Sequence, residues 1–200
     1  TIRAGDLGSR GHLDKPVTFE DLKSDHRPAD YRVEQVRYRS KDGTEISMFI
    51  VGKHNLARDG RNPTLLWAYG GFNISITPNF LAHRIAFLEK GGLLAIPNLR
   101  GGGEYGQKWH EAGMLSKKQN VFDDYIAAAE YLVKEKYTSP EFLCGEGRSN
   151  GGLLMGAVLT QRPELFKAIV CGVPLLDMVR YPKFLIGRQW LPEYGDPDDK

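Results

Sequence analysis

A Gly-x-Ser-x-Gly motif at Gly147–Gly151 carries the strongest chemical signal in this sequence. In this motif the serine lies on a sharp turn between a strand and a helix, where its hydroxyl is exposed for nucleophilic attack. The flanking segments fit that setting, because Phe142–Cys144 is apolar and strand-like, and Leu153–Gln161 is apolar, rich in helix formers and free of proline. The motif therefore predicts that Ser149 is the nucleophile of an acyl-transfer reaction.

The residues around Ser149 favour an oxyanion at this point. Gly147, Gly151 and Gly152 lack the Cβ atoms that would clash where a strained turn crosses its neighbours. A helix that begins after the serine offers free backbone N–H groups and the positive end of its dipole. The alternative interpretation is a glycine-rich turn whose serine only caps the helix.

The segments that must position this turn alternate between strand and helix patterns. Strands are predicted at Val33–Tyr38, Ile46–Val51, Thr64–Tyr69, Leu93–Ile96 and Ala168–Val173, and helices at Leu81–Lys90 and Val121–Lys136. The turn at Lys41–Thr44 predicts a hairpin between the first two strands. Asn120 is expected to cap the second helix, with Asp123 and Asp124 opposing its dipole. The order predicts a doubly wound, mostly parallel α/β sheet, followed by a surface loop over Leu191–Lys200.

Composition narrows the possible classes of protein. The 200 residues are 41% hydrophobic and 26% charged, with a net charge of +2, as in one globular domain or a large part of one. No basic stripe or long apolar segment is present, so the sequence predicts neither a nucleic-acid partner nor a membrane span. Cys144 and Cys171 are interpreted as small buried hydrophobic residues. Because Thr1–Lys15 has no apolar core, a cytoplasmic location is predicted, with a periplasmic one left open.

From about Tyr31 onward, the sequence resembles the catalytic domain of the prolyl oligopeptidase family, which are serine peptidases with an α/β-hydrolase fold. The resemblance rests on Tyr69–Pro78, Asn98–Gly106, Trp109–His110, Lys118–Asp124, Ser149–Leu154, Gln161–Phe166 and Glu193–Gly195. Several such segments in one order are far more specific than the serine motif alone. The family resemblance implies cleavage of short peptides on the carboxyl side of proline.

The resemblance also implies a role for individual residues. Ser149 attacks the scissile carbonyl, and the backbone N–H of Asn150 and the hydroxyl of Tyr69 hold the resulting oxyanion. The substrate proline would lie in an aromatic pocket, which suits a flat ring without an amide hydrogen. The residues that match positions lining this pocket are Phe72, Trp190, Tyr194 and Leu175. The other interpretation of these aromatic residues is that they are part of the hydrophobic core.

The resemblance divides the chain into two parts. Residues 1–30 are interpreted as a linker or the tail of a preceding propeller domain, and residues 31–200 as a partial catalytic domain that stops before the fold is complete. In this fold the triad follows the order serine, acid, histidine, yet all five histidines precede Ser149. His110 is interpreted as structural. We expect the chain alone to be nearly inactive, and to self-associate or to need the C-terminal part.

Three other functions fit parts of the sequence. The glycines of Gly101–Gly106 formally match a dinucleotide fingerprint, but Asp123 and Asp124 open a helix instead of ending a second strand. A non-catalytic binding module is a second alternative, since no base follows Ser149. An esterase or an aminopeptidase-like relative is the third. No metal site and no cofactor are predicted, because the histidines lack partners at metal-binding spacing.

Overall fold

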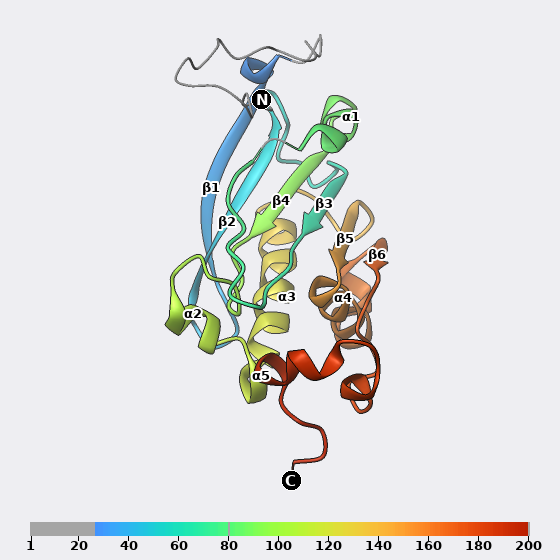
Figure 1. Cartoon of the computed structure of the whole chain (residues 1–200). Helices are drawn as coiled ribbons and strands as arrows, with labels where there is room; N and C mark the ends of the chain where they lie inside the picture. The colour runs from blue at the N-terminus through green and yellow to red at the C-terminus, as the bar shows by residue number, and fades with distance from the viewer. Residues whose placement is uncertain (1–26, 80, 200) are drawn as a thin grey trace, which may run out of the picture.

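The computed structural model describes residues 27–79 and 81–199, in which six strands form one mixed sheet (Figure 1). The strands are β1 (Tyr31–Arg39), β2 (Glu45–Lys53), β3 (Thr64–Trp67), β4 (Leu93–Pro97), β5 (Leu143–Arg148) and β6 (Ala168–Gly172). Their order across the sheet is β1-β2-β4-β3-β5-β6. Strand β2 pairs antiparallel with β1 and β4, whereas β4, β3, β5 and β6 run parallel. The predicted mostly parallel sheet is confirmed.

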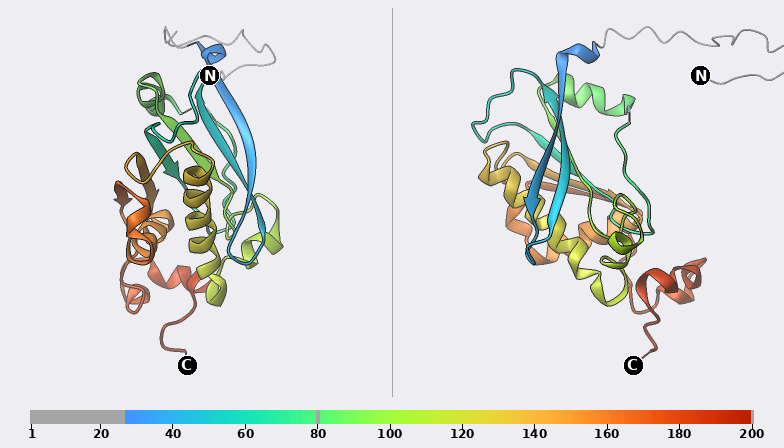
Figure 2. Two further views of the ribbon diagram at one scale, coloured as in Figure 1. Left: turned by 180° about the vertical axis from the view of Figure 1, so that it is seen from behind. Right: turned by 90° about the vertical axis from the view of Figure 1, so that its left-hand side faces the viewer.

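Helices lie on both faces of this sheet (Figure 2). They are α1 (Ile85–Glu89), α2 (Gln107–Glu111), α3 (Gln119–Lys134), α4 (Asn150–Gln161) and α5 (Leu191–Tyr194). Short 3₁₀ turns occur at Pro28–Asp30, Ala82–Arg84, Leu115–Lys117, Pro163–Leu165, Tyr181–Lys183 and Gly187–Trp190. Helices α3 and α4 pack on one face, and the short α1 covers part of the other. Among the described residues, no helix is long and apolar enough to cross a membrane.

The core lies between the sheet and helices α3 and α4. Leu66 and Ala95 are fully buried on this face, and Tyr125 and Met155 cover them from the helices. The Tyr125 hydroxyl donates a hydrogen bond of 2.7 Å to the carbonyl of Leu66, which fixes α3 to β3. Burying one large apolar side chain in this way contributes about 1.5–3 kcal/mol. This packing holds β5 and α4, and thus the turn between them, in a fixed orientation.

A buried ion cluster fastens the β1–β2 hairpin to α3. The Arg100 guanidinium, 5% exposed, lies 2.6 Å from Asp124, which is fully buried, and 2.5 Å from Asp42 in the hairpin turn. Hydrogen bonding to Arg100 lowers the pKa of Asp42 to about 2. Asp124 also accepts a bond of 3.1 Å from the Arg100 backbone N–H. The loop after β4 is therefore held from two sides.

Four local predictions are wrong. Helix α3 begins at Gln119, so Asn120 does not cap it, and its amide donates to the carbonyl of Ala112. Asp123 and Asp124 lie beyond the first turn of α3, where Asp124 serves Arg100 instead of the helix dipole. The predicted loop over Leu191–Lys200 contains α5, whose Glu193 is 3% exposed. Cys171 is exposed on β6, because that strand lies at the sheet edge.

Candidate active site

The nucleophile turn follows the carboxyl end of β5. Ser149 has φ 57° and ψ −117°, a conformation that L residues rarely adopt, and its N–H donates to the carbonyl of Gly172. A Cβ atom added at Gly147 would lie 2.2 Å from the carbonyl oxygen of Gly151. One added at Gly151 would lie 2.6 Å from that of Ala68. These two glycines therefore let β5 turn directly into α4 with Ser149 at its tip.

Tyr69 lies beside Ser149, two residues beyond the end of β3. Burial raises the pKa of the Tyr69 hydroxyl, a hydrogen bond with Ser149 opposes that shift, and the charge of Glu193 adds to it. The hydroxyl thus stays protonated at neutral pH and can donate to a developing negative charge. The first backbone N–H groups of a helix have no partner within it, and Asn150 is the first residue of α4. Both expected oxyanion donors therefore flank the serine.

The Asn150 side chain joins α4 to the segment that carries Tyr69. Asn150 is 1% exposed, and its amide nitrogen donates a bond of 2.7 Å to the carbonyl of Tyr69. Its amide oxygen accepts a bond of 2.9 Å from the hydroxyl of Tyr194. Gly71 packs against this side chain, since an added Cβ would lie 2.5 Å from the Asn150 amide nitrogen. One buried amide thereby connects the nucleophile turn to the Tyr69 segment and to α5.

Aromatic rings gather next to Ser149. The rings of Phe72 and Tyr194 meet edge to face, with centroids 5.6 Å apart, and the Tyr69 ring lies 6.5 Å from that of Phe72. Tyr181, which the sequence did not single out, lies edge to face against Tyr194 at 5.6 Å. All of them except Tyr181 are only partly buried. An apolar, ring-lined surface therefore borders the nucleophile.

Trp190 and Leu175 lie at the edge of this group of aromatic rings. The indole of Trp190 stacks on the ring of Tyr181 at 6.5 Å, so Tyr181 stands between it and Tyr194. Leu175 is partly buried in the segment after β6. Its neighbour Pro174 contacts the start of α4, because a Cβ at Gly152 would lie 2.7 Å from the Pro174 Cα. The structure thus gathers Tyr69, Phe72 and Tyr194 closely, and leaves the other two at the border.

A buried charged group, which no sequence pattern predicted, supports the ring-lined surface. Glu193 accepts a bond of 3.0 Å from Lys118, and its other oxygen lies 2.8 Å from His110 Nε2. The side chains of these residues are 4%, 13% and 15% exposed. His110 belongs to α2 and Glu193 to α5, so only the three-dimensional fold brings them together. A carboxylate in an expected loop gives no periodic signal that could have predicted this pairing.

The described residues offer no proton acceptor for Ser149 of the expected type. All five histidines precede Ser149 in the sequence, and His110 Nε2 is occupied by Glu193. Within the described ranges, no group of three or more His, Cys, Asp or Glu side chains could hold a metal ion. The residues around Ser149 can thus supply a nucleophile, stabilise an oxyanion and bind an apolar side chain of a substrate, whereas the base must come from elsewhere.

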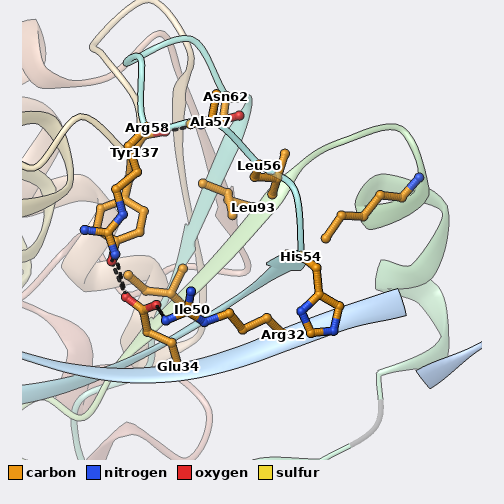
Figure 3. Close-up of a pocket in the computed structure, with 12 residues that line it drawn as sticks. Arg32, Glu34, Ile50, His54, Leu56, Ala57, Arg58, Asn62, Leu93 and Tyr137 are labelled. Atoms are coloured by element: carbon orange, nitrogen blue, oxygen red, sulfur yellow. Dashed lines mark hydrogen bonds and ion pairs between the residues drawn. The ribbon is translucent and has the colours of Figure 1, made fainter. Parts of the chain in front are cut away.

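A separate cavity of about 60 Å³, lined by both charged and apolar side chains, lies near the starts of β3 and β4, away from Ser149 (Figure 3). There Arg58 lies over the ring of Tyr137 at 4.2 Å and forms an ion pair of 2.9 Å with Glu34. Tyr137 also donates to Glu34, and burial, followed by that contact, raises the pKa of the Tyr137 hydroxyl. These groups satisfy one another, and none of the predicted site residues lies here.

Comparison with known proteins gives one consistent family. A profile described as "Prolyl oligopeptidase family" matches residues 78–200. A prolyl endopeptidase of Elizabethkingia miricola is 51% identical over 185 residues, which is 92% of this chain and 26% of that protein. A solved structure from a study of inter-domain dynamics in two prolyl endopeptidases aligns with a TM-score of 0.87 and 58% identity, over 88% of this chain and 26% of that one. The chain thus spans about a quarter of these relatives.

Structures of prolyl oligopeptidase B from Galerina marginata add information on substrates. One of them, bound to a 35-residue hydrolysis and macrocyclization substrate, aligns with a TM-score of 0.85 and 41% identity, over 88% of this chain and 25% of that one. In related structures of the same protein with bound peptide, alanine replaces a serine, an aspartate or a histidine. In that protein's sequence the three residues follow in the order serine, aspartate, histidine.

Proposed function

The chain belongs to the prolyl oligopeptidase family, and from this premise we propose that it supplies the nucleophile, the oxyanion donors and the proline pocket of a serine endopeptidase. The substrates would be short peptides cleaved on the carboxyl side of proline. The observation that carries the proposal is the position of Ser149, at the strained start of α4, where its side chain makes no cap hydrogen bond and lies beside the Tyr69 hydroxyl. A serine that only capped a helix would not need a phenol beside its oxygen.

The proposed reaction begins with attack of Ser149 Oγ on the scissile carbonyl carbon. The carbonyl π electrons move to oxygen, and the Asn150 N–H and the Tyr69 hydroxyl stabilise the resulting negative charge. When the tetrahedral intermediate collapses, the C–N bond breaks, the amine leaves with a proton, and an acyl group stays on Ser149. Water then attacks the acyl carbon and releases the new carboxyl end, with the serine proton restored.

The aromatic surface supports selection of proline. The rings of Phe72 and Tyr194 meet at 85°, so they form a corner for a flat, saturated ring that donates no amide hydrogen bond. Trp190, Leu175 and Tyr181 extend this surface. An acidic residue that could select a basic side chain is missing from this ring set, since Glu193 is buried under His110 and Lys118. These features favour an apolar ring over a charged side chain.

Removal of the serine proton requires a base that residues 149–200 do not include, because no histidine follows Ser149 among them. In triads of this fold the acid and the histidine come after the serine, which is also their order in the Galerina protein. We propose that the 200-residue chain alone turns over substrate at a very low rate. We further propose a cytoplasmic enzyme, since Thr1–Lys15 has no apolar core, and one without a nucleic-acid partner, since the net charge is only +2.

The proposal can be tested in a chimeric enzyme, termed the exchanged enzyme, in which this chain replaces the matching segment of a longer relative. The segment of the Elizabethkingia miricola prolyl endopeptidase that this chain matches is replaced by the chain, and hydrolysis of a chromogenic peptide with proline before the scissile bond is measured. We expect activity that prefers proline over alanine at this position. Ser149→Ala should lower kcat by about a millionfold, as loss of a triad serine does. The same assay on the 200-residue chain should give almost no turnover.

Ser139→Ala is the matched control, because Ser139 lies in the loop before β5, away from the nucleophile turn. Its kcat should stay within about twofold of the unchanged enzyme, as expected for a site outside the catalytic group. Fast hydrolysis that survives Ser149→Ala would overturn the proposal. Peptide binding without hydrolysis would support the binding-module alternative, and equal rates for simple esters and proline peptides would support an esterase.

A further inference from the structure

Lys118 lies at the centre of the contacts beneath the proposed oxyanion site. Its ammonium donates a bond of 3.2 Å to the carbonyl of Gly70 and one of 3.0 Å to Glu193. The same nitrogen lies 5.4 Å from the centroid of the Tyr194 ring. One side chain thus contacts the residue after Tyr69, the ring that meets Phe72, and the carboxylate of α5.

The segment held by Lys118 has little freedom of its own. Gly70 has φ +64°, and an added Cβ would lie 2.6 Å from Val121, so only glycine fits there. The carbonyl of Tyr69 is bonded by Asn150 and that of Gly70 by Lys118, so two consecutive peptide oxygens are fixed from two sides. Phe72 follows with φ 55°, another left-handed residue. The direction of the Tyr69 hydroxyl and of the Phe72 ring therefore depends on these two anchors.

A buried ammonium is an unusual anchor for a peptide carbonyl. Burial lowers the pKa of the Lys118 amine, and the charge of Glu193 opposes that shift. His110 lies against the second oxygen of Glu193, and its Nδ1 is buried without a hydrogen-bond partner among the described atoms. A neutral hydrophobic residue would fill this space without desolvating charges. The buried charge of Lys118 is therefore better explained by its role in holding the Gly70 carbonyl in place than by a contribution to folding stability.

We propose that Lys118 is a positioning residue for the reaction, an inference that rests on the proposed function. It holds the Tyr69–Phe72 segment so that the Tyr69 hydroxyl meets the oxyanion on Ser149. Glu193, supported by His110, keeps the Lys118 ammonium charged and pointed at Gly70. Lys118 does not touch the reacting atoms, and it acts through Tyr69. A displacement of about 1 Å in a catalytic group can lower the rate about a hundredfold, so the anchor has a measurable effect.

The test combines Lys118→Met with Tyr69→Phe in the exchanged enzyme. Lys118→Met should lower kcat about 10- to 100-fold, with a change in KM below about threefold, because the hydroxyl acts mainly on the transition state. In the Tyr69→Phe background, Lys118→Met should lower kcat by less than about twofold, since contacts that act as a unit are not additive. Equal effects of Lys118→Met in both backgrounds would overturn the inference.

Lys117→Met is the matched control, because Lys117 is exposed and adjacent in the sequence. It should leave kcat unchanged. Lys118→Met leaves Glu193 without its cation and could impair folding, so the double variant Lys118→Met with Glu193→Gln is measured as well. This variant removes both charges and still deprives Gly70 of its donor, so the same loss of kcat is expected. Unchanged kcat in a folded double variant would contradict the inference.

Hydrogen exchange on the full 200-residue chain separates the two proposals. Lys118→Met should speed exchange of the backbone amides of residues 70–73, while Lys117→Met should not. An exchanged enzyme without Ser149-dependent hydrolysis would refute the proposed function, and the exchange data would then decide whether Lys118 holds this segment. An active enzyme in which Lys118→Met changes neither kcat nor exchange would refute only the role of Lys118.

Discussion

Ser149 combines reactivity with an unfavourable backbone. Its φ of 57° and ψ of −117° lie outside the regions that L residues commonly occupy. A residue held in such a region costs on the order of 1–3 kcal/mol and persists only where its surroundings enforce it. The surroundings here are the tight packing of Gly147 on Gly151 and the bond from the Ser149 N–H to Gly172. In this conformation the Ser149 side chain makes no cap hydrogen bond to its own helix and lies beside the Tyr69 hydroxyl.

Tyr69→Phe tests the oxyanion role of the phenol at the level of a single residue. The change removes one donor and keeps the ring against Phe72. We expect kcat of the exchanged enzyme to fall about 100- to 1000-fold, as for other single oxyanion donors, with KM nearly unchanged. Steady-state kinetics with a proline peptide measures this. Tyr105→Phe is the control, since Tyr105 is 49% exposed and its hydroxyl bonds to Ser47 instead of a residue beside Ser149. A loss of less than about fivefold for Tyr69→Phe would refute a donor role.

At the level of elements, the Arg100 cluster determines how the hairpin meets α3. Asp124→Asn leaves the shape of the side chain and removes the charge that faces the buried guanidinium of Arg100. Asp42 still pairs with the outer side of Arg100, but the buried side loses its counter-charge, so we expect the free energy of unfolding to fall by about 1–3 kcal/mol. Urea unfolding followed by circular dichroism measures the change. Asp123→Asn, one residue earlier and less buried, should change it by less than about 0.5 kcal/mol. Equal effects of the two changes would exclude a special role for Asp124.

The same cluster predicts how stability depends on pH. The pKa of Asp42 is about 2 in the folded chain, below its ordinary value of 3.8, chiefly because Arg100 bonds to the charged form. A lowered folded-state pKa means that the stabilisation is complete above pH 3.8 and is lost as the pH falls from there through about 2. Asp42→Asn should therefore be less stable than the unchanged chain near neutral pH, and the difference should vanish near pH 2. Urea titrations across this range test it, and a pH-independent difference would contradict the pairing.

Most elements could be predicted from sequence because their signals are local. The apolar strand segments placed the ends of five strands within about two residues, as expected for element ends. The strand before Ser149 was predicted to end at Cys144, but β5 continues to Arg148, because Gly145 and Gly147 interrupt its apolar pattern. Strand β3 ends at Trp67 instead of Tyr69, since the segment leaves the sheet to bring Tyr69 to Ser149. Helix α5 was missed because Pro192 and Gly195 are typical of loops. Tertiary contacts stabilise α5 instead, since His110 and Lys118 bury Glu193.

The site could be predicted only in part for the same reason. Ser149 and its glycines have a local pattern, and the family resemblance singled out Tyr69, Phe72 and Tyr194, which the structure brings together. Lys118 and Tyr181 follow no motif with a stated role, and their contacts join segments far apart in the sequence. Pairing across such distances depends on the packed sheet. The catalytic roles themselves stay predictions until the substitutions are measured.

At the level of the whole molecule, β6 forms one edge of the described sheet. It pairs only with β5 among the described strands, and Val170 is 54% exposed on it. Unpaired strand edges with exposed apolar residues associate readily. We expect the 200-residue chain to self-associate, and Val170→Lys to shift it toward the monomer in sedimentation velocity. Val179→Lys is the control, because Val179 is 74% exposed in a turn outside the sheet. A monodisperse, cooperatively folded monomer would contradict this prediction.

The strand order also has a consequence for synthesis on the ribosome. Strand β3 lies in the middle of the sheet, yet Trp67 finds its partner Glu146 only on β5. At about 5–20 residues per second, the nascent chain carries β3 with one side unprotected for on the order of 4–16 seconds before β5 is made. Chaperones that bind emerging apolar segments would therefore be expected to engage this protein during translation, before the nucleophile turn has been polymerised.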